Sequence, residues 1–309
     1  MKYNTSKTKN QALSSFLNFV NSFLSYKLSR VRVLGVQNEN GDVKFFKLPV
    51  RGTELYYRFY IKRRFKEIKR ALGGLVKVEG NKTNAIFLTL TYDKQISDLR
   101  FLDVIWSSSG LNASDFINRL KKRFKRLGFE FEYVKVIEAQ RFFDDKFQVN
   151  GKPHFHFVLV FRNTFFRFHR RRGKYWFSDK VLYRKLLGII EKTWGLGFVS
   201  ISPVFSSGGA VSYISKYISK SSFLEFSGDF KNDDDFKKRI LFYYLLMYHL
   251  RFFSVSRGLT KLDKTLYNNS DTLSGDRWVL YRGEIPVWVV RLFSQGVISL
   301  ILRGFLNSS

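Results

Sequence analysis

The segment PHFHFVLVF (153–161) alternates in a way that predicts a β-strand with two different faces. Successive side chains of a strand point to opposite faces, so Phe155 and Phe157 share one face while His154 and His156 share the other. The phenylalanine face can form core. The other face carries two of the four histidines of the chain, one pleat apart, which suits two imidazoles on one metal ion. The alternative is a pair of half-exposed histidines on a sheet surface.

A second strand is predicted at FEYVKVIEAQ (131–140), joined to the first through a turn at Asn150-Gly151. Glu138 and Gln140 share one face of it, and either can meet the histidines if the two strands pair. Glu138 is preferred as the third ligand because a carboxylate offsets the charge of a divalent ion better than an amide does. The alternative for Glu138 is a surface pair with a lysine. Imidazole plus carboxylate suits Mn²⁺ or Mg²⁺, and zinc is also compatible by residue type.

Further strands and helices extend this pattern in both directions along the chain. Strands are predicted at 85–92, 131–140, 153–161 and 198–205, and helices at 114–128, 178–195 and 208–222. Ser114 and Ser178 are the expected N-caps of the first two helices. The order strand, helix, strand, strand, helix, strand predicts an α+β fold, a split βαβ domain with a central antiparallel sheet flanked by helices.

Three regions are expected along the chain. Residues 1–80 form a basic, partly helical extension, in which a helix at 54–72 ends at Gly73-Gly74. Residues 81–222 form the α+β domain. Residues 223–309 form a mostly helical extension, in which the charge run KNDDDFKKR (231–239) is expected to be solvated and to begin a helix.

The charge of the chain predicts a polyanionic partner. Its 309 residues hold 54 Lys plus Arg against 25 Asp plus Glu, a formal net charge of +29. Such a field attracts nucleic acid, with an anionic membrane surface as the competing partner. Apolar runs are too short to span a bilayer, so no stable membrane insertion is expected, and the N-terminus does not resemble a signal peptide. The chain has no cysteine, which excludes thiol chemistry and fits a cytoplasmic protein.

The segment VSYISKYISK (211–220) repeats a tyrosine and a lysine at a spacing of four residues. On a helix, positions three and four apart share a face, so Tyr213, Tyr217, Lys216 and Lys220 are expected to project from one stripe. The alternative is an amphipathic helix that packs through its tyrosines and solvates its lysines.

The segment FFRFHRRRGKYWF (165–177) combines cations with aromatic rings. Arginines bind phosphates and aromatic faces stack on unpaired bases. The residues expected to bind DNA are Arg170, Arg171, Arg172, Lys174, Tyr175 and Trp176. The alternative is a solvated basic loop, to which His169 also belongs; His249 is interpreted as structural.

Three segments together resemble the three motifs of the HUH-superfamily rolling-circle replication initiators. They are FLTLTY (87–92), GKPHFHFVLV (151–160) and YISKYISK (213–220), in that order. The two-tyrosine form is similar to the Rep proteins of microviruses, which are single-stranded DNA phages, and of related plasmids. The resemblance covers residues 81–222, with a weaker similarity at RFFSVSRGLTK (251–261). The first family motif is usually structural, so strand packing is expected for its threonines.

The resemblance implies a metal-dependent nickase and strand-transferase. His154 and His156, with a nearby acidic or polar residue, would hold a divalent cation that polarises the scissile phosphate of single-stranded DNA. Tyr213 and Tyr217 match the two nucleophiles, which form a 5′-phosphotyrosine and leave a free 3′-OH. Lys216 or Lys220 would favour the phenolate or balance charge in the transition state.

The implied partners are single-stranded DNA at a replication origin, a host helicase and a host polymerase. The chain has no G-x-x-x-x-G-K-[ST] motif, so unwinding is expected from another protein. Two alternatives stay open. One is a transposase or relaxase with the same chemistry. The other is a non-catalytic protein that binds single-stranded DNA or RNA through its aromatic and basic residues.

Overall fold

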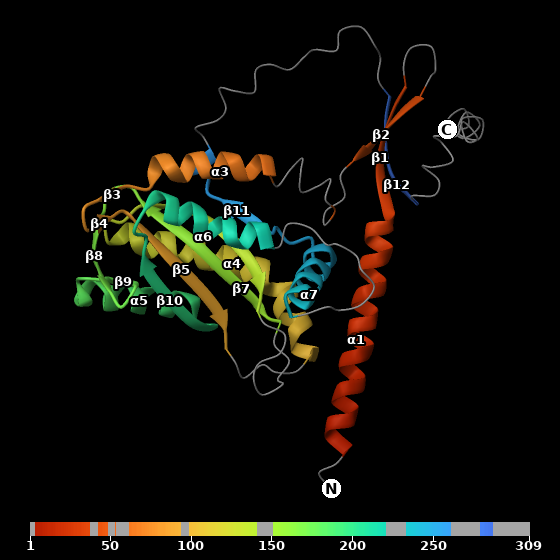
Figure 1. Ribbon diagram of the computed structural model, residues 1–309, viewed down its shortest axis with the longest axis horizontal. Coiled ribbons are helices and arrows are strands. Elements are labelled where there is room, and N and C mark those ends of the chain that lie inside the picture. The colour runs from red at the N-terminus through yellow and green to blue at the C-terminus, as the bar shows by residue number, and fades with distance from the viewer. Residues whose placement is uncertain are drawn as a thin grey trace.

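The computed structural model describes residues 4–37, 43–48, 53, 62–93, 99–140, 151–220, 233–260 and 279–286. Parts of three expectations lie outside these ranges: residues 54–61 of the helix expected at 54–72, Asn150 of the expected turn, and residues 221–222 of the helix expected at 208–222. Figure 1 shows the arrangement of the helices and strands.

A five-stranded antiparallel sheet forms the centre of the molecule, with the order β10-β5-β7-β6-β11. Its strands are β5 (Ala85–Tyr92), β6 (Phe131–Ala139), β7 (Pro153–Phe161), β10 (Gly197–Pro203) and β11 (Phe253–Val255). The chain order β5, α4 (Leu99–Arg126), β6, β7, α5 (Lys180–Trp194), β10 is that of a split βαβ unit. The structure therefore confirms the α+β class, and β11 adds a fifth strand beside β6.

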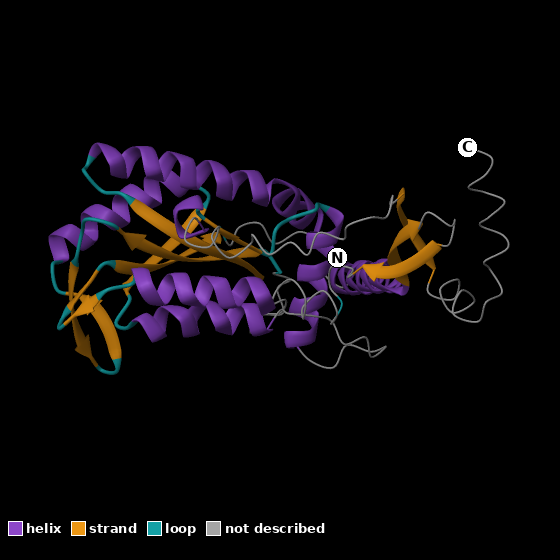
Figure 2. Cartoon of the chain, turned by 90° about the horizontal axis from the view of Figure 1, so that it is seen from above, coloured by secondary structure: helices purple, strands orange, loops and turns teal. Residues whose placement is uncertain are grey.

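Helices cover both faces of this sheet, as Figure 2 shows from above. One face packs against α4, α5, α7 (Asp233–Met247) and α1 (Asn4–Ser29). The other packs against α3 (Lys62–Leu75), α6 (Ser207–Lys220) and α8 (Arg257–Thr260). The alternation of β7 assigns its side chains to the two cores: Phe155, Phe157 and Leu159 enter the first core, while Val158 and Val160 enter the second.

Two smaller sheets lie outside the central one. The order β3-β4-β8-β9 joins β3 (Val78–Glu79) and β4 (Lys82–Thr83) to a hairpin of β8 (Phe166–Arg171) and β9 (Lys174–Phe177). The order β12-β1-β2 pairs β12 (Val279–Pro286), from near the C-terminus, with β1 (Arg30–Gln37), which also pairs with β2 (Val43–Leu48). Among the helices of the described residues, none is long and apolar enough to cross a membrane.

Helix α4 begins earlier than the sequence indicates, at Leu99 rather than Ser114. Ser114 is therefore not an N-cap; its hydroxyl donates to the carbonyl of Gly110 inside the helix. Ser109 makes the same kind of bond to Trp106. Serines that bond to carbonyls one turn back can be accommodated within a helix, although the sequence pattern favours them at its start.

The ends of two other helices also differ from expectation. The N-cap of α5 is Asp179 rather than Ser178, because the Asp179 carboxylate accepts from the N–H groups of Val181 and Leu182. Helix α3 continues through Gly73 and Gly74 to Leu75, so the glycine pair does not end it.

The charge run before α7 is not wholly solvated. Arg239 is only 1% exposed and forms an ion pair with Asp235, at 3.1 Å. It also donates to the side-chain oxygen of Asn21 on α1, at 2.7 Å. Next to it, Phe16 and Phe23 of α1 meet the ring of Tyr243 edge-on. These contacts dock the N-terminal helix on α7.

Lys135 on β6 faces the core that contains α4, and this position should make the protein less stable at neutral pH. Burial, together with the charge of Arg251, lowers the pKa of the Lys135 ammonium to about 8. The Phe155 ring, 5.6 Å from Nζ, offsets part of the cost of the charge. Because the folded-state pKa is below the unfolded one, the folded protein gains stability as pH rises from about 8 to about 10.5.

We therefore expect Lys135→Met to raise the free energy of unfolding at pH 7 by about 1–3 kcal/mol. The gain should shrink as the pH rises above 8 and be nearly absent above pH 10.5. Urea unfolding at several pH values measures this, with Lys122→Met on the exposed surface of α4 as the control. A loss of stability at pH 7, or a gain that does not depend on pH, would contradict the assignment.

Candidate metal centre and tyrosine helix

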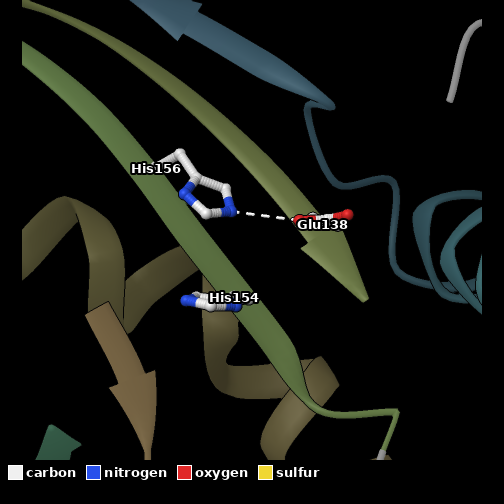
Figure 3. A group of neighbouring side chains, drawn as sticks. All are labelled: Glu138, His154 and His156. Atoms are coloured by element: carbon white, nitrogen blue, oxygen red, sulfur yellow. Dashed lines mark hydrogen bonds and ion pairs between the residues drawn. The ribbon is translucent and has the colours of Figure 1, made fainter. Parts of the chain in front are cut away.

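The register of three adjacent strands brings the candidate ligands together. His154 on β7 lies opposite Glu138 on β6 and opposite Thr91 on β5, and His156 lies opposite Thr89. Directly opposite residues of an antiparallel pair share a face, so all of these side chains project from the same side of the sheet. Figure 3 shows the two histidines on one strand and the glutamate on its neighbour.

The three ligand side chains form a compact group. Nε2 of His156 lies 3.0 Å from Oε2 of Glu138, and one ligand atom from each of Glu138, His154 and His156 lies within 4.8 Å of the others. Gln140, the alternative ligand, follows the end of β6, where its N–H donates to the Lys152 carbonyl. Two imidazoles and a carboxylate at this spacing fit a divalent metal ion with coordination positions left open.

The protonation of the group suits metal binding. Burial, together with the neighbouring His156, lowers the pKa of His154 to about 4, so its imidazole is neutral at pH 7. Burial opposes ionisation of Glu138, but the hydrogen bond and charge of His156, with the charges of His154 and Lys237, lower the pKa of this carboxyl below its ordinary value. Neutral imidazole and ionised carboxylate are the forms that bind metals.

Helix α6 covers the histidines with its two tyrosines. Ala210 and Ile214 are fully buried in the second core and fix the face that α6 turns toward the sheet. The Tyr213 hydroxyl lies 2.9 Å from Nδ1 of His156 and 3.1 Å from Oγ1 of Thr89. The Tyr217 ring stacks on the His156 ring, with centroids 3.7 Å apart and planes 15° from parallel.

Both phenols are poor nucleophiles as they stand. Burial raises the pKa of Tyr213 and, more strongly, that of Tyr217 above the ordinary value. Removal of either proton would require nearby positive charge. Nζ of Lys216 lies 6.0 Å from the centre of the Tyr217 ring, while Lys220 lies in α6 with its side chain outside the described atoms.

Three site residues were not identified as such from the sequence. Thr89 bonds to Tyr213, and Oγ1 of Thr91 lies 3.1 Å from Nε2 of His154, so both threonines do more than pack the strand. Lys152 is 4% exposed and donates to the carbonyl of Asp93, tying together the ends of β7 and β5 beside the histidines. Alternation predicts that the threonines share a face, but only the strand register places them against the site.

The basic-aromatic segment is a hairpin separate from the metal centre. Phe161 ends β7, about 23 Å along the strand from His154, and the hairpin follows it. Arg172 and Gly173 both have positive φ, which is the requirement of a tight two-residue turn. The structure thus gives a hairpin rather than a loop, at the opposite end of β7 from the histidines, as Figure 1 shows.

The two faces of this hairpin differ. Tyr175 stacks on Phe205, the rings 4.1 Å apart, and the Arg170 guanidinium lies over the outer face of Tyr175, so this ring is not an open stacking surface. Trp176 is 51% exposed on the opposite face. Five other exposed side chains share the Trp176 face by register: Lys82, Arg167, His169, Arg171 and Lys174.

Residues 85–222 match a family model of replication-associated proteins, the ORF2 family. The match covers less than half of the 309 residues, but it includes the strands β5, β6 and β7 and the helix α6 that build the site. It supports a protein of replication initiation that interacts with DNA. Comparison of the chain with curated proteins and with solved structures finds no match.

Proposed function

We propose that this protein is a HUH-type, two-tyrosine rolling-circle replication initiator that nicks single-stranded DNA and transfers the cut strand through tyrosine. The observation that carries the proposal is the contact of the tyrosine helix with the metal-ligand group: the Tyr213 hydroxyl lies 2.9 Å from a histidine that is itself 3.0 Å from Glu138. A non-catalytic binding protein has no need for two imidazoles, a carboxylate and a phenol in contact.

Each residue of the site has a task in this reaction. Glu138, His154 and His156 would hold Mn²⁺ or Mg²⁺, which when bound neutralises negative charge on the scissile phosphate. A tyrosine of α6 supplies the oxygen that attacks phosphorus. Lys216 lies close enough to the Tyr217 ring to favour the phenolate electrostatically.

The proposed substrate is single-stranded DNA at a replication origin. A net charge of +29 supplies the attraction for a phosphate backbone. The sequence has no nucleotide-binding G-x-x-x-x-G-K-[ST] motif, so a host helicase would open the duplex and a host polymerase would extend the free 3′-OH. The reaction itself conserves phosphodiester energy in the tyrosine bond and requires no nucleotide.

The exposed face of the β8–β9 hairpin is proposed to hold the strand several nucleotides from the cut. Trp176 offers an open ring for base stacking, and cations surround it on the same face. Arg170 and Arg172 flank this face, while Tyr175 supports the hairpin through Phe205. The proposed DNA contacts of the hairpin are thus centred on Trp176.

We expect the triple variant Arg167→Ala, Arg171→Ala, Lys174→Ala to bind single-stranded DNA with a weaker salt dependence. Removing one phosphate-binding cation should flatten the slope of log affinity against log salt by about 0.7, hence about 2 for three cations. Fluorescence anisotropy at several salt concentrations measures the slope. The charge-matched control removes Lys122, Lys125 and Arg126, which are exposed on α4. Equal slopes for the two triple variants would place the DNA path away from the hairpin.

Covalent trapping tests the proposed function. The full chain is incubated with Mn²⁺ and a labelled pool of single-stranded oligonucleotides of random sequence, then denatured and separated by electrophoresis. A labelled band at the mass of protein plus DNA, absent when EDTA is added, is the expected result. Binding of the pool without any such band, at every Mn²⁺ concentration tested, would favour the non-catalytic alternative.

A further inference from the structure

Both ring nitrogens of His156 are in use, and this constrains what the neighbouring tyrosine can do. Nε2 faces Glu138 at 3.0 Å, and Nδ1 faces the Tyr213 hydroxyl at 2.9 Å. Only Nε2 therefore points into the ligand group. A neutral imidazole carries one proton, so a histidine that binds a cation through Nε2 carries its proton on Nδ1 and donates from there.

The Tyr213 hydroxyl is then fully engaged. It accepts the Nδ1–H of His156 with one lone pair, and its own proton can go to Oγ1 of Thr89, 3.1 Å away. Its ring is held at the same time against Phe87, with centroids 4.2 Å apart. An attack on phosphorus by this oxygen would break the bond that orients His156.

Tyr217 has a different set of contacts. Its ring lies flat on the His156 ring and meets the Tyr213 ring edge-on, with centroids 5.1 Å apart. Its hydroxyl interacts with that of Tyr213, and this contact is not directed at a metal ligand. Ring stacking fixes the phenol over the site and still allows its oxygen to reach a bound phosphate.

We propose that the two tyrosines have separate roles: Tyr217 is the nucleophile, and Tyr213 is a positioning residue that orients His156 through Nδ1. This assignment rests on the proposed nickase function. In the step, the Tyr217 oxygen forms a bond to phosphorus as the bond from phosphorus to the 3′ oxygen breaks. The phenol proton leaves to water and the 3′ oxygen takes a proton from water, so the products are a 5′-phosphotyrosine and a 3′-OH.

A competing arrangement uses the same contacts in a different way. Tyr213 would be the nucleophile, His156 its general base and Glu138 the group that orients the base, as in other nucleophile–histidine–carboxylate sets. It requires Nδ1 to accept a proton, and therefore excludes a cation on Nε2 of the same neutral ring. The two arrangements predict opposite effects of the Tyr213 hydroxyl on metal affinity and on the site of the adduct.

Metal affinity without DNA is the first test. Free Mn²⁺ is titrated by electron paramagnetic resonance against the wild-type protein, Tyr213→Phe and Tyr217→Phe. Loss of an outer hydrogen bond to a metal ligand is expected to weaken Mn²⁺ binding about 10–100-fold in Tyr213→Phe. Tyr217→Phe keeps its ring stack and should bind like the wild type. Wild-type affinity in a Tyr213→Phe protein with an unchanged melting temperature would overturn the assignment.

Thr89 supplies a conservative rescue for the same test. Thr89→Val removes the second partner of the Tyr213 hydroxyl and should weaken Mn²⁺ binding in the same direction, whereas Thr89→Ser keeps the hydroxyl and should restore the affinity. A purely packing role would give Thr89→Val, which has nearly the same shape as the wild type, unchanged Mn²⁺ affinity. That result would overturn the role of the hydrogen-bonded network.

Peptide mapping of the wild-type adduct is the second test. After protease and nuclease digestion, mass spectrometry is expected to find the nucleotide on Tyr217. An adduct on Tyr213, alone or in equal amount, would overturn the separation of roles. If the wild-type protein forms no adduct, the nickase proposal fails, and the Mn²⁺ comparison still decides whether Tyr213 orients His156.

Discussion

Replacement of both His154 and His156 by alanine is expected to lower the rate of covalent-adduct formation at least about a hundredfold. The change removes two of the three ligands that would hold the cation, and a bound metal contributes several kcal/mol of charge stabilisation in the transition state. The measurement is the single-turnover rate with a labelled oligonucleotide in Mn²⁺.

The matched control for this variant is His169→Ala, because His169 is an exposed histidine of the hairpin. Single-stranded DNA affinity should be largely kept in the double variant, since the hairpin lies at the other end of β7. Adduct formation at the wild-type rate would contradict the metal site. An equal loss of DNA affinity and of melting temperature would point instead to a folding defect.

Arg239→Ala is expected to lower the free energy of unfolding by about 2–4 kcal/mol. The substitution leaves Asp235 without its ion-pair partner and Asn21 without its hydrogen-bond donor, in a contact where Arg239 is 1% exposed. The N-terminal helix should loosen from α7 as a result. Urea unfolding of the full chain measures the loss, and hydrogen exchange of α1 locates it.

Two further variants separate charge from packing at this contact. Lys238→Ala removes the neighbouring charge and should change the stability by less than about 0.5 kcal/mol. Arg239→Met keeps much of the side-chain volume and should recover part of the loss only if packing contributes. A loss below about 0.5 kcal/mol in Arg239→Ala would show that the α1–α7 contact does not depend on this pair.

The central sheet could be predicted from the sequence because its strands state their own faces. In β7, the alternation of Phe155 and Phe157 with His154 and His156 fixes which side chains enter the core. The strand order also follows from the element order of a split βαβ unit. The choice between Glu138 and Gln140 depends on where β6 ends, and strand ends are set by tertiary contacts rather than by alternation.

Other features depended on contacts between distant segments. The first half of α4 contains serines that normally favour helix starts, and burial of Trp106 and Phe116 outweighs their preference. The pairing of β1 with β12 joins segments more than 240 residues apart, which no local pattern indicates. By contrast, Asn40-Gly41 between two alternating stretches was a hairpin signal in the sequence that was overlooked.

The chemistry of the cut ends tests the proposed nickase most directly. A single-stranded oligonucleotide is labelled separately at its 5′ and 3′ ends and incubated with the wild-type protein and Mn²⁺. The expected result is that the 3′-labelled fragment becomes attached to the protein, while the 5′-labelled fragment is released with a 3′-OH that a polymerase can extend. Release of both fragments free of protein, one of them with a 5′-phosphate, would show hydrolysis by water and contradict attack by tyrosine.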